Sequence, residues 1–360
     1  MSRFWHEDWD GARQRLTDWW HRKGCALFVT APKDEPWADV SEPKAPERLE
    51  DRWTDPAYRT ARDVRRLSRT YFGGAAFPYV DTVIGPGSLG LFLGNDPGFA
   101  PDTVWYEPAD PSSLDKLGGP EVPTRREIEG NRWFQVHLAF VEEALRVADG
   151  RFLVGMPDLI ENLDTLAQLV GPEPLMYDLI ERPAWVQRSI EQINFAYFEA
   201  FDAIYDRIRT PWGGNAFAAF GLWGPGKTAK VQCDAFAMIS PAMAREFVLP
   251  SLTEQCEWLD YSMFHLDGTQ AMGHLEQLLA IEDLDAIEWT PQAGIESGGN
   301  PRWYDLYRGI LGAGKSVQAI GVEAHEVLPL LDACGHEGMF VMATAPDEKT
   351  ARALVQKVYG

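Results

Sequence analysis

A histidine and an aspartate that can carry chemistry lie two residues apart at the end of an apolar segment. The segment runs Tyr261-Ser-Met-Phe-His265 and continues as Leu-Asp267-Gly268. In a β-strand, residues i and i+2 project from the same face, so His265 and Asp267 would point the same way. Such a pair can bind a divalent metal such as zinc, or act as a general acid and base. The structural alternative is a core histidine held by its neighbouring carboxylate.

A third acidic residue, Glu288, interrupts the apolar segment Ala286–Pro291. A carboxylate inside such a segment is costly unless it is paired or has a function. We therefore assign Glu288, together with His265 and Asp267, to the catalytic group, with His265 and Asp267 as the metal ligands if a metal is bound. Trp289, the next residue, can stack on a ligand or pack in the core.

Other polar and aromatic residues follow strand-like segments or lie in a glycine-rich stretch. The aspartates among them can face a ligand or cap the next helix, and Glu323 opens a helical segment. The tryptophans can offer flat surfaces to a sugar ring or a planar cofactor, or simply pack. The predicted substrate-binding residues are Asp158, Trp212, Trp223, Asp234, Trp289 and Glu323.

Two glycine-rich segments formally match nucleotide-binding patterns, but neither has the required context. Gly85–Gly90 fits G-x-G-x-x-G, yet Gly94 and Pro97 interrupt the helix that should follow. Gly221–Thr228 fits G-x-x-x-x-G-K-[ST]. There Pro225 has no N–H to offer a phosphate, and the next residues are typical of a strand rather than a helix. We expect neither NAD nor ATP as a cofactor.

Apolar segments of strand length recur along the chain, and from Trp133 onward they alternate with amphipathic helices. The predicted strands are 26–30, 79–84, 152–156, 216–222, 262–266, 286–290, 316–320 and 339–343. The predicted later helices are 160–182, 184–207, 241–259, 271–281, 301–312, 323–333 and 347–358. Unbroken apolar strands are typical of a parallel sheet covered on both faces, and the repeated alternation predicts an α/β fold of the (βα)8 TIM-barrel type. An open, doubly wound sheet is the alternative.

We interpret residues 1–360 as a single barrel domain with two additions. A helix over 5–22, ended by Gly24, forms an N-terminal extension spanning 1–24. Residues 31–131 are rich in Pro, Gly and charge and form a loop-rich insertion that contains a helix from about 56 to 71. In a TIM barrel, the carboxyl ends of the strands carry the active site, so the catalytic group is expected at that edge.

The charge balance excludes several classes of partner. The chain has 33 Lys and Arg against 54 Asp and Glu, a formal charge of −21, which argues against nucleic acid and anionic membrane surfaces. No apolar run approaches the ~20 residues of a membrane helix. The N-terminus is not a signal peptide, and the four cysteines are scattered. We expect a cytoplasmic protein that acts on a small molecule, and leave a homodimer open.

Three segments are similar to the uroporphyrinogen decarboxylase-like superfamily: 233–252, 264–268 and 284–290. The first contains Ile-Ser-Pro241 followed by a helix ending in Leu-Pro250, and the second contains His-Leu-Asp-Gly268. The similarity extends over roughly residues 150–358 and is weaker before them. It implies a (βα)8 barrel. It also implies an enzyme related to porphyrinogen decarboxylases and to methyltransferases that move methyl groups between corrinoid proteins, folates and thiols.

The chain departs from these relatives at the metal ligands. The thiol-directed methyltransferases hold zinc through His-x-Cys and a later cysteine, whereas here Asp267 follows His265 and residues 341–346 contain no cysteine. A site of this composition is harder and suits water activation better than thiol activation. Residues 25–45 also lack the arginine with which the decarboxylases bind substrate carboxylates, so an octacarboxylate substrate is not expected.

The leading hypothesis is methyl transfer or demethylation of a small substrate, with a corrinoid or folate, or a corrinoid protein, as methyl carrier. A first alternative is a glycoside-directed hydrolase or lyase in which Asp267 and Glu288 are the working carboxylates and Trp212 or Trp223 the platforms. A second is decarboxylation of a small acid, which requires a cation at the barrel mouth. A third is a non-catalytic binding protein, which predicts a closed mouth and a buried His265.

Overall fold

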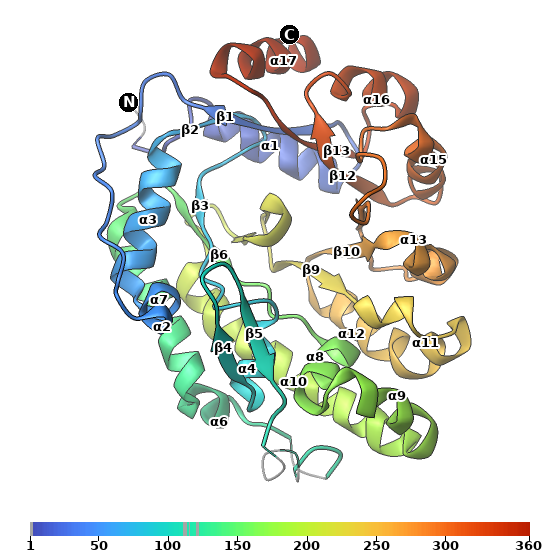
Figure 1. The fold of residues 1–360 in the computed structure, drawn as a ribbon. Coiled ribbons are helices and arrows are strands. Elements are labelled where there is room, and N and C mark those ends of the chain that lie inside the picture. Colours follow the sequence, from blue (N-terminus) through green and yellow to red (C-terminus); the bar gives the residue numbers. More distant parts are fainter. Residues whose placement is uncertain (1–2, 111–113, 115, 120–121) are drawn as a thin grey trace.

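The larger of the two sheets that contain parallel strands is built from the C-terminal part of the chain together with two strands near its N-terminus. The computed structural model describes residues 3–110, 114, 116–119 and 122–360 (Figure 1). The strand order is β2-β1-β13-β12-β11-β10-β9, and every neighbouring pair except β1–β2 is parallel. The strands are β1 (Ala26–Pro32), β2 (Thr70–Gly74), β9 (Thr228–Gln232), β10 (Tyr261–Asp267), β11 (Ala286–Thr290), β12 (Ser316–Glu323) and β13 (Met339–Thr344).

The second sheet has the order β3-β6-β7-β8, with β3, β6 and β7 parallel and β8 returning antiparallel. Its strands are β3 (Tyr79–Val80), β6 (Leu153–Met156), β7 (Asn215–Phe217) and β8 (Leu222–Gly224). β7 and β8 contact β9 of the larger sheet, and Figure 1 shows the strands around a common centre with helices outside. The α/β fold with mostly parallel strands is confirmed. Among the described residues, the strands of these two sheets are not joined by hydrogen bonds into one closed cylinder.

The segment predicted as one strand over 216–222 is instead a tight hairpin. Phe220 and Gly221 have positive φ values of 63° and 59°, and these two consecutive left-handed residues reverse the chain between β7 and β8. A Cβ atom on Gly221 would lie 2.7 Å from the ring of Phe28 on β1 and 3.1 Å from the Met342 side chain on β13. The hairpin tip therefore reaches the interior, between strands far away in the sequence.

Helices surround the sheets, and their ends follow local sequence signals. They are α7 (Arg132–Ala148), α8 (Asn162–Val170), α9 (Pro172–Glu181), α10 (Pro183–Ile208), α11 (Pro241–Phe247), α12 (Leu249–Trp258), α13 (Gly268–Ala271), α14 (Leu275–Leu279), α15 (Tyr304–Gly312), α16 (Val327–Cys334) and α17 (Glu348–Tyr359). The single helix predicted over 160–182 is divided at Gly171, which has a φ of 94° and precedes a proline at the start of α9. The 3-10 turns are η1 (Ala219–Gly221), η2 (Asp234–Ala237), η3 (Met272–His274) and η4 (Pro301–Trp303).

The N-terminal helix α1 (Trp9–Trp20) covers the end of the larger sheet where its strands begin. Asp8 caps it by accepting a hydrogen bond from the Gly11 N–H. The indole N–H of Trp19 donates to the carbonyls of Val317 and Gly338, at the starts of β12 and β13. This contact leaves the opposite edge, at the carboxyl ends of the strands, for the predicted site.

Residues 31–131 contain more regular structure than predicted. They include α2 (Leu49–Thr54), α3 (Pro56–Ser68), β2, β3, α4 (Ser88–Leu93), α6 (Arg125–Gly130) and the antiparallel pair β4 (Asp96–Phe99) and β5 (Val104–Glu107). Asp55 caps α3 through the N–H groups of Ala57 and Tyr58, and Pro56 is its first residue. Among the described helices, none is both long enough and apolar enough to cross a bilayer.

Candidate functional site

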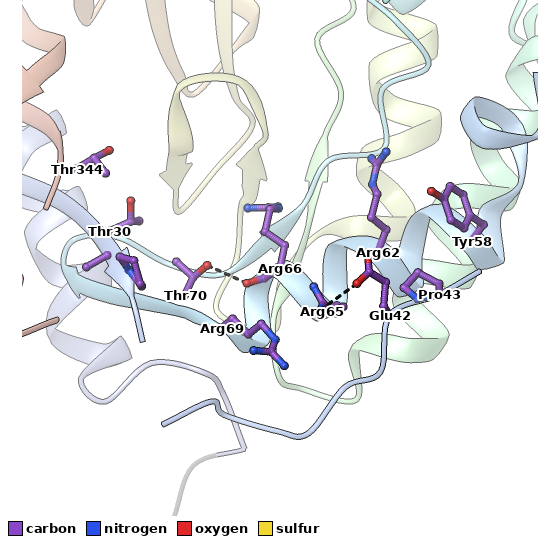
Figure 2. Close-up of a pocket in the computed structure, with 12 residues that line it drawn as sticks. Thr30, Glu42, Pro43, Tyr58, Arg62, Arg65, Arg66, Arg69, Thr70 and Thr344 are labelled. Atoms are coloured by element: carbon purple, nitrogen blue, oxygen red, sulfur yellow. Dashed lines mark hydrogen bonds and ion pairs between the residues drawn. The ribbon is translucent and has the colours of Figure 1, made fainter. Parts of the chain in front are cut away.

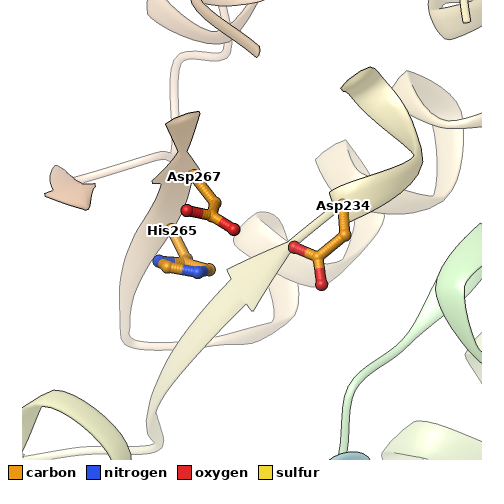
Figure 3. Close-up of side chains that lie close together, drawn as sticks. All are labelled: Asp234, His265 and Asp267. Atoms are coloured by element: carbon orange, nitrogen blue, oxygen red, sulfur yellow. The ribbon is translucent and has the colours of Figure 1, made fainter. Parts of the chain in front are cut away.

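Three potential metal ligands gather where β9 and β10 end (Figure 3). His265 and Asp267 come from the last residues of β10, and Asp234 opens the turn η2 after β9. One ligand atom from each residue lies within 4.8 Å of those of the other two. Asp234 and Asp267 are exposed and His265 is partly buried, so the group, called the Asp–His–Asp cluster below, faces solvent at the carboxyl ends of the strands.

Glu288 supports the histidine from the neighbouring strand. The parallel register places it directly beside His265, and its Oε2 lies 2.5 Å from His265 Nδ1. The hydroxyl of Thr290 donates to Glu288 Oε1 at 2.7 Å. The glutamate side chain is fully buried, while that of His265 is 12% exposed. Glu288 is therefore held inside the protein, and of the two side chains only the imidazole reaches solvent at the carboxyl ends of the strands.

The pair favours retention of a proton between its two members. Burial raises the pKa of the Glu288 carboxyl above its ordinary value, although the hydrogen bond to His265 opposes this. Burial alone would lower the pKa of His265, but the hydrogen bond and charge of Glu288 outweigh it, and the pKa of His265 is raised. With Nδ1 committed to Glu288, Nε2 is the nitrogen that remains for a ligand. This is the arrangement by which carboxylates orient metal-binding histidines.

A buried aspartate fixes the segment that carries Asp234. Asp164 on α8 accepts hydrogen bonds from the backbone N–H groups of Asp234 at 2.7 Å and Ala235 at 3.1 Å, and from the Gln232 side chain at 3.0 Å. Partial desolvation, followed by the negative charge of Asp164, raises the pKa of Asp234 to about 6. The position of Asp234 thus depends on α8, a contact that sequence spacing does not indicate.

A buried charge network lies behind the cluster. Lys230 on β9 has a fully buried side chain whose Nζ lies 2.8 Å from Asp158 Oδ2, and it also donates to Gln232. Burial would lower the pKa of Lys230, but the charges of Asp158 and Glu161 outweigh this and raise it. Asp158, predicted to bind substrate, is thus engaged in an ion pair.

Glu161 is the least satisfied member of this network. Its Oε1 accepts the Gln232 N–H at 2.5 Å, while its buried Oε2 has no hydrogen-bond partner in the described part of the chain. Burial raises the pKa of Glu161 to about 8. Sequence reasoning singled out neither Lys230 nor Glu161. An ionisable residue inside the short apolar run 229–231 was the available signal for the lysine.

The hairpin tip between β7 and β8 lies against the histidine. The ring of Phe220 is 4.8 Å from the His265 ring, centroid to centroid, with 38° between their planes. The Phe220 carbonyl accepts a hydrogen bond of 2.7 Å from Gln318 on β12. Its left-handed backbone is strained for a bulky residue, and such strain persists only where surrounding contacts hold it. Phe220 therefore covers one side of the imidazole.

The remaining predicted binding residues do not join the cluster. Trp223 is 2% exposed and its carbonyl accepts the Trp20 indole N–H, so it packs under α1. Trp212 lies beside Trp9 of α1, with ring centroids 5.8 Å apart. Both tryptophans lie at the opposite end of the strands from the cluster: Trp212 precedes β7, and Trp223 is on β8, which runs back antiparallel to β7.

Trp289 and Glu323 also lie outside the Asp–His–Asp cluster. Trp289 alternates with Glu288 along β11, points to the outer side of the sheet and packs on Trp303 at 4.9 Å between ring centroids. Glu323 ends β12 with a 71% exposed side chain beside His325. Lys227, in the segment that matches a phosphate-binding pattern, forms an ion pair of 2.8 Å with Asp202.

Comparisons with known proteins place this geometry in a structural context. No family model matches the chain, and no curated protein matches it by sequence. A solved methyltransferase from Methanosarcina mazei superimposes with a TM-score of 0.62 at 14% sequence identity, covering 97% of this chain and 99% of the other. What the two proteins share is a fold. Membership of the uroporphyrinogen decarboxylase-like superfamily stays a prediction.

Proposed function

We propose that this protein is a methyl-transferring enzyme whose Asp–His–Asp cluster binds a divalent metal ion. The observation that carries the proposal is the histidine whose Nδ1 is fixed by a buried glutamate and whose other nitrogen shares the mouth with two carboxylates. The methyltransferase fold of the structural neighbour supports the reaction class. The substrate is a small molecule, and the carrier is a corrinoid or a folate.

The donor set fits a metal of intermediate or hard character. Three protein ligands with room for a fourth are typical of catalytic zinc, and ligand atoms about 2.1 Å from one ion in a tetrahedron lie roughly 3.5 Å apart. The observed separations of up to 4.8 Å require only a small side-chain movement. Cys233, next to Asp234, is buried, and this burial raises the pKa of its thiol well above the ordinary value. The chemistry of the site therefore favours oxygen or nitrogen substrates over thiols.

A bound ion would act as a Lewis acid on the oxygen or nitrogen atom that loses or receives the methyl group. The protein's own residues prepare the site for this. Glu288 sets the tautomer and orientation of His265, Asp164 positions Asp234, and Phe220 covers one face of the imidazole. Together they hold the three ligand groups around one solvent-facing point.

The glycoside and binding-protein alternatives receive less support. A glycoside mechanism needs two carboxylates facing each other across an open cleft, whereas Glu288 is fully buried and hydrogen-bonded to His265 and Thr290. Its proposed aromatic platforms lie under or beside α1. The non-catalytic alternative requires a sealed His265, but this residue is partly exposed between two exposed carboxylates.

Decarboxylation of a small acid remains the second candidate, because a cation lies next to the mouth. The buried ammonium of Lys230 is close enough to Asp234 and His265 to influence the pKa of both. The two candidates differ in product. Decarboxylation releases carbon dioxide, whereas methyl transfer methylates the carrier.

Metal content tests the first half of the proposal. Protein purified without chelators should hold about one divalent ion per chain, and His265→Ala should lower its affinity at least about 100-fold, because a ligand is lost. Glu323→Gln is the matched control, an exposed acid at another strand end that should leave the metal in place. Equal metal retention by His265→Ala and Glu323→Gln would contradict the site.

Activity tests the second half. Metal-loaded protein is incubated with small O-methyl and N-methyl compounds and either a reduced corrinoid or tetrahydrofolate, and methylation of the carrier is followed by absorbance or mass spectrometry. Carrier methylation that disappears in His265→Ala is expected. Release of carbon dioxide from small acids, with no carrier methylation, would replace methyl transfer by decarboxylation while leaving the metal site intact.

A further inference from the structure

A cavity of about 570 Å³ lies along α3 at the ends of β1 and β13 (Figure 2). Its polar lining combines arginines with threonine hydroxyls: Thr30, Arg62, Arg65, Arg66, Arg69, Thr70 and Thr344. Thr30 and Thr344 pair across β1 and β13, at the same edge of the larger sheet as Asp267 on β10. We call this space the arginine cavity.

Helical spacing brings the arginines to one side of α3. Arg65 and Arg66 lie three and four positions after Arg62, one turn further along α3, and Arg69 follows three positions after Arg66 as the C-cap of the helix. Figure 2 shows Arg62 and Arg66 extending to the same side, with Arg65 and Glu42 paired between them. Arg59, on the same helix, behaves differently. It is 6% exposed and donates hydrogen bonds to the carbonyls of Val83 and Trp53, so its role is to hold these buried backbone segments together.

The positive charge in the arginine cavity is only partly compensated. Arg65 lies 3.2 Å from Glu42, the one acidic residue among those lining the cavity. Arg62 and Arg66 approach Asp63 no closer than 3.7 and 3.9 Å, which is longer than a hydrogen bond. No ion pair of Arg69 occurs in the described part of the chain, and the buried Nε of Arg65 has no hydrogen-bond partner there. Four guanidinium groups thus face few acceptors.

This arrangement is unusual for a chain with a formal charge of −21. A protein of that charge repels anions in general, so an anion is bound only where cations are concentrated locally. Guanidinium groups match phosphate and carboxylate oxygens in geometry and remain charged at all physiological pH values. The hydroxyls of Thr30 and Thr344 add neutral donors at the opposite wall.

We propose that the arginine cavity binds a small molecule carrying at least two phosphate or carboxylate groups. Its volume admits a compact ligand of this kind, and the spacing of Arg62, Arg66 and Arg69 along two turns suits two anionic groups rather than one. The inference does not depend on the metal or on methyl transfer. If the ligand is part of a larger substrate or carrier, its charged end is held at the same edge of the sheet as the Asp–His–Asp cluster.

Calorimetric titration with tripolyphosphate and with citrate, at low salt, tests this proposal. The unaltered protein should bind at least one of them, more weakly as salt is added, and the preferred ligand distinguishes phosphate from carboxylate recognition. The double variant Arg62→Gln/Arg66→Gln should bind at least about tenfold more weakly, since it loses two charge-assisted contacts. Arg146→Gln, an exposed arginine on α7 paired with Glu143, should bind as before.

A variant that is expected to bind anions more tightly serves as a control for a general loss of folding. Glu42→Gln removes the carboxylate that competes for Arg65, so it should tighten anion binding severalfold. All variants should unfold at the same temperature without anion, because the altered side chains are mainly exposed. Absence of binding by both anions, or equal weakening in Arg62→Gln/Arg66→Gln and Arg146→Gln, would overturn the proposal.

Discussion

Two regions of opposite charge share one edge of the larger sheet, and they are built in different ways. The Asp–His–Asp cluster is formed by strand ends, and the register between β10 and β11 places His265 beside its supporting glutamate. The arginine cavity is formed by the period of one helix, laid along the ends of β1 and β13. Strand register fixes a few side chains closely relative to one another, whereas a helical face presents several long and partly exposed charged side chains.

The largest predicted difference between the regions concerns the cost of removing a cation. Lys230→Met leaves the partly buried carboxylate of Asp158 without its ion-pair partner and should lower the free energy of unfolding by about 3–5 kcal/mol. Arg66→Met, at a side chain that is 57% exposed, should change it by less than about 0.5 kcal/mol. Urea denaturation measures both. Similar values for the two variants would remove the distinction between a structural and a ligand-binding cation.

A smaller effect is expected at the support of the histidine. Glu288→Gln keeps the shape of the side chain but loses the charge that orients and polarises His265, so metal affinity should fall about 10–100-fold. Anion binding in the arginine cavity should be unchanged, which calorimetry of the same sample can check. If metal affinity were also unchanged, Glu288 would not act as the positioning residue that its contacts indicate.

The two regions should also differ in pH dependence. Metal binding requires Asp234, whose pKa is raised to about 6, and His265, whose pKa is also raised, to lose their protons, so affinity should increase as pH rises through 6 and continue to increase above it. Asp164→Asn removes the neighbouring charge and should move this increase to lower pH. Binding of ethanedisulfonate, whose charge is constant, to the arginine cavity should stay flat over the same range. Parallel titrations at pH 5, 6 and 7 separate the two behaviours.

The smallest effect concerns the stability of the buried network. The pKa of Glu161 is about 8 in the folded protein and 4.5 ordinarily, so the folded state holds the proton more tightly. The stability that this tighter proton binding adds to the folded state is complete below pH 4.5 and is lost as pH rises toward 8. The Gln side chain of Glu161→Gln stays neutral. Its free energy of unfolding, relative to that of the unaltered protein, should therefore rise by at least about 1 kcal/mol when the pH is raised from 5 to 8.5. A difference that does not change with pH would mean that Glu161 is ionised throughout.

Sequence reasoning located the cluster because its signals are local. The two-residue spacing of His265 and Asp267, the acid within the run 286–291 and the position of Asp234 after a strand all lie within single elements. Their assembly then follows from parallel strands ending at one edge, which the structure has. The catalytic roles of these residues stay predictions.

The missed features depend on contacts between distant segments. Lys230 is buried by Asp158 and Glu161, about 70 residues earlier, and its own segment gives no sign of those partners. Trp223 was expected at a ligand, but its backbone meets Trp20 of α1, and only the reversal at Phe220 brings it there. The arginine cavity likewise needs β1 and β13 to complete a face that the helix alone shows as exposed.

The reversal at Phe220 has a consequence for how the protein could change its substrate. The ring against His265 belongs to the hairpin tip between β7 and β8, where the Phe220 carbonyl accepts a hydrogen bond from Gln318, and not to the strands that carry His265 and Asp267. Replacing this one side chain by a smaller one would open space beside the imidazole without altering the residues of the Asp–His–Asp cluster. Substitutions at position 220 would therefore change which molecules fit beside His265 without altering the Asp–His–Asp cluster.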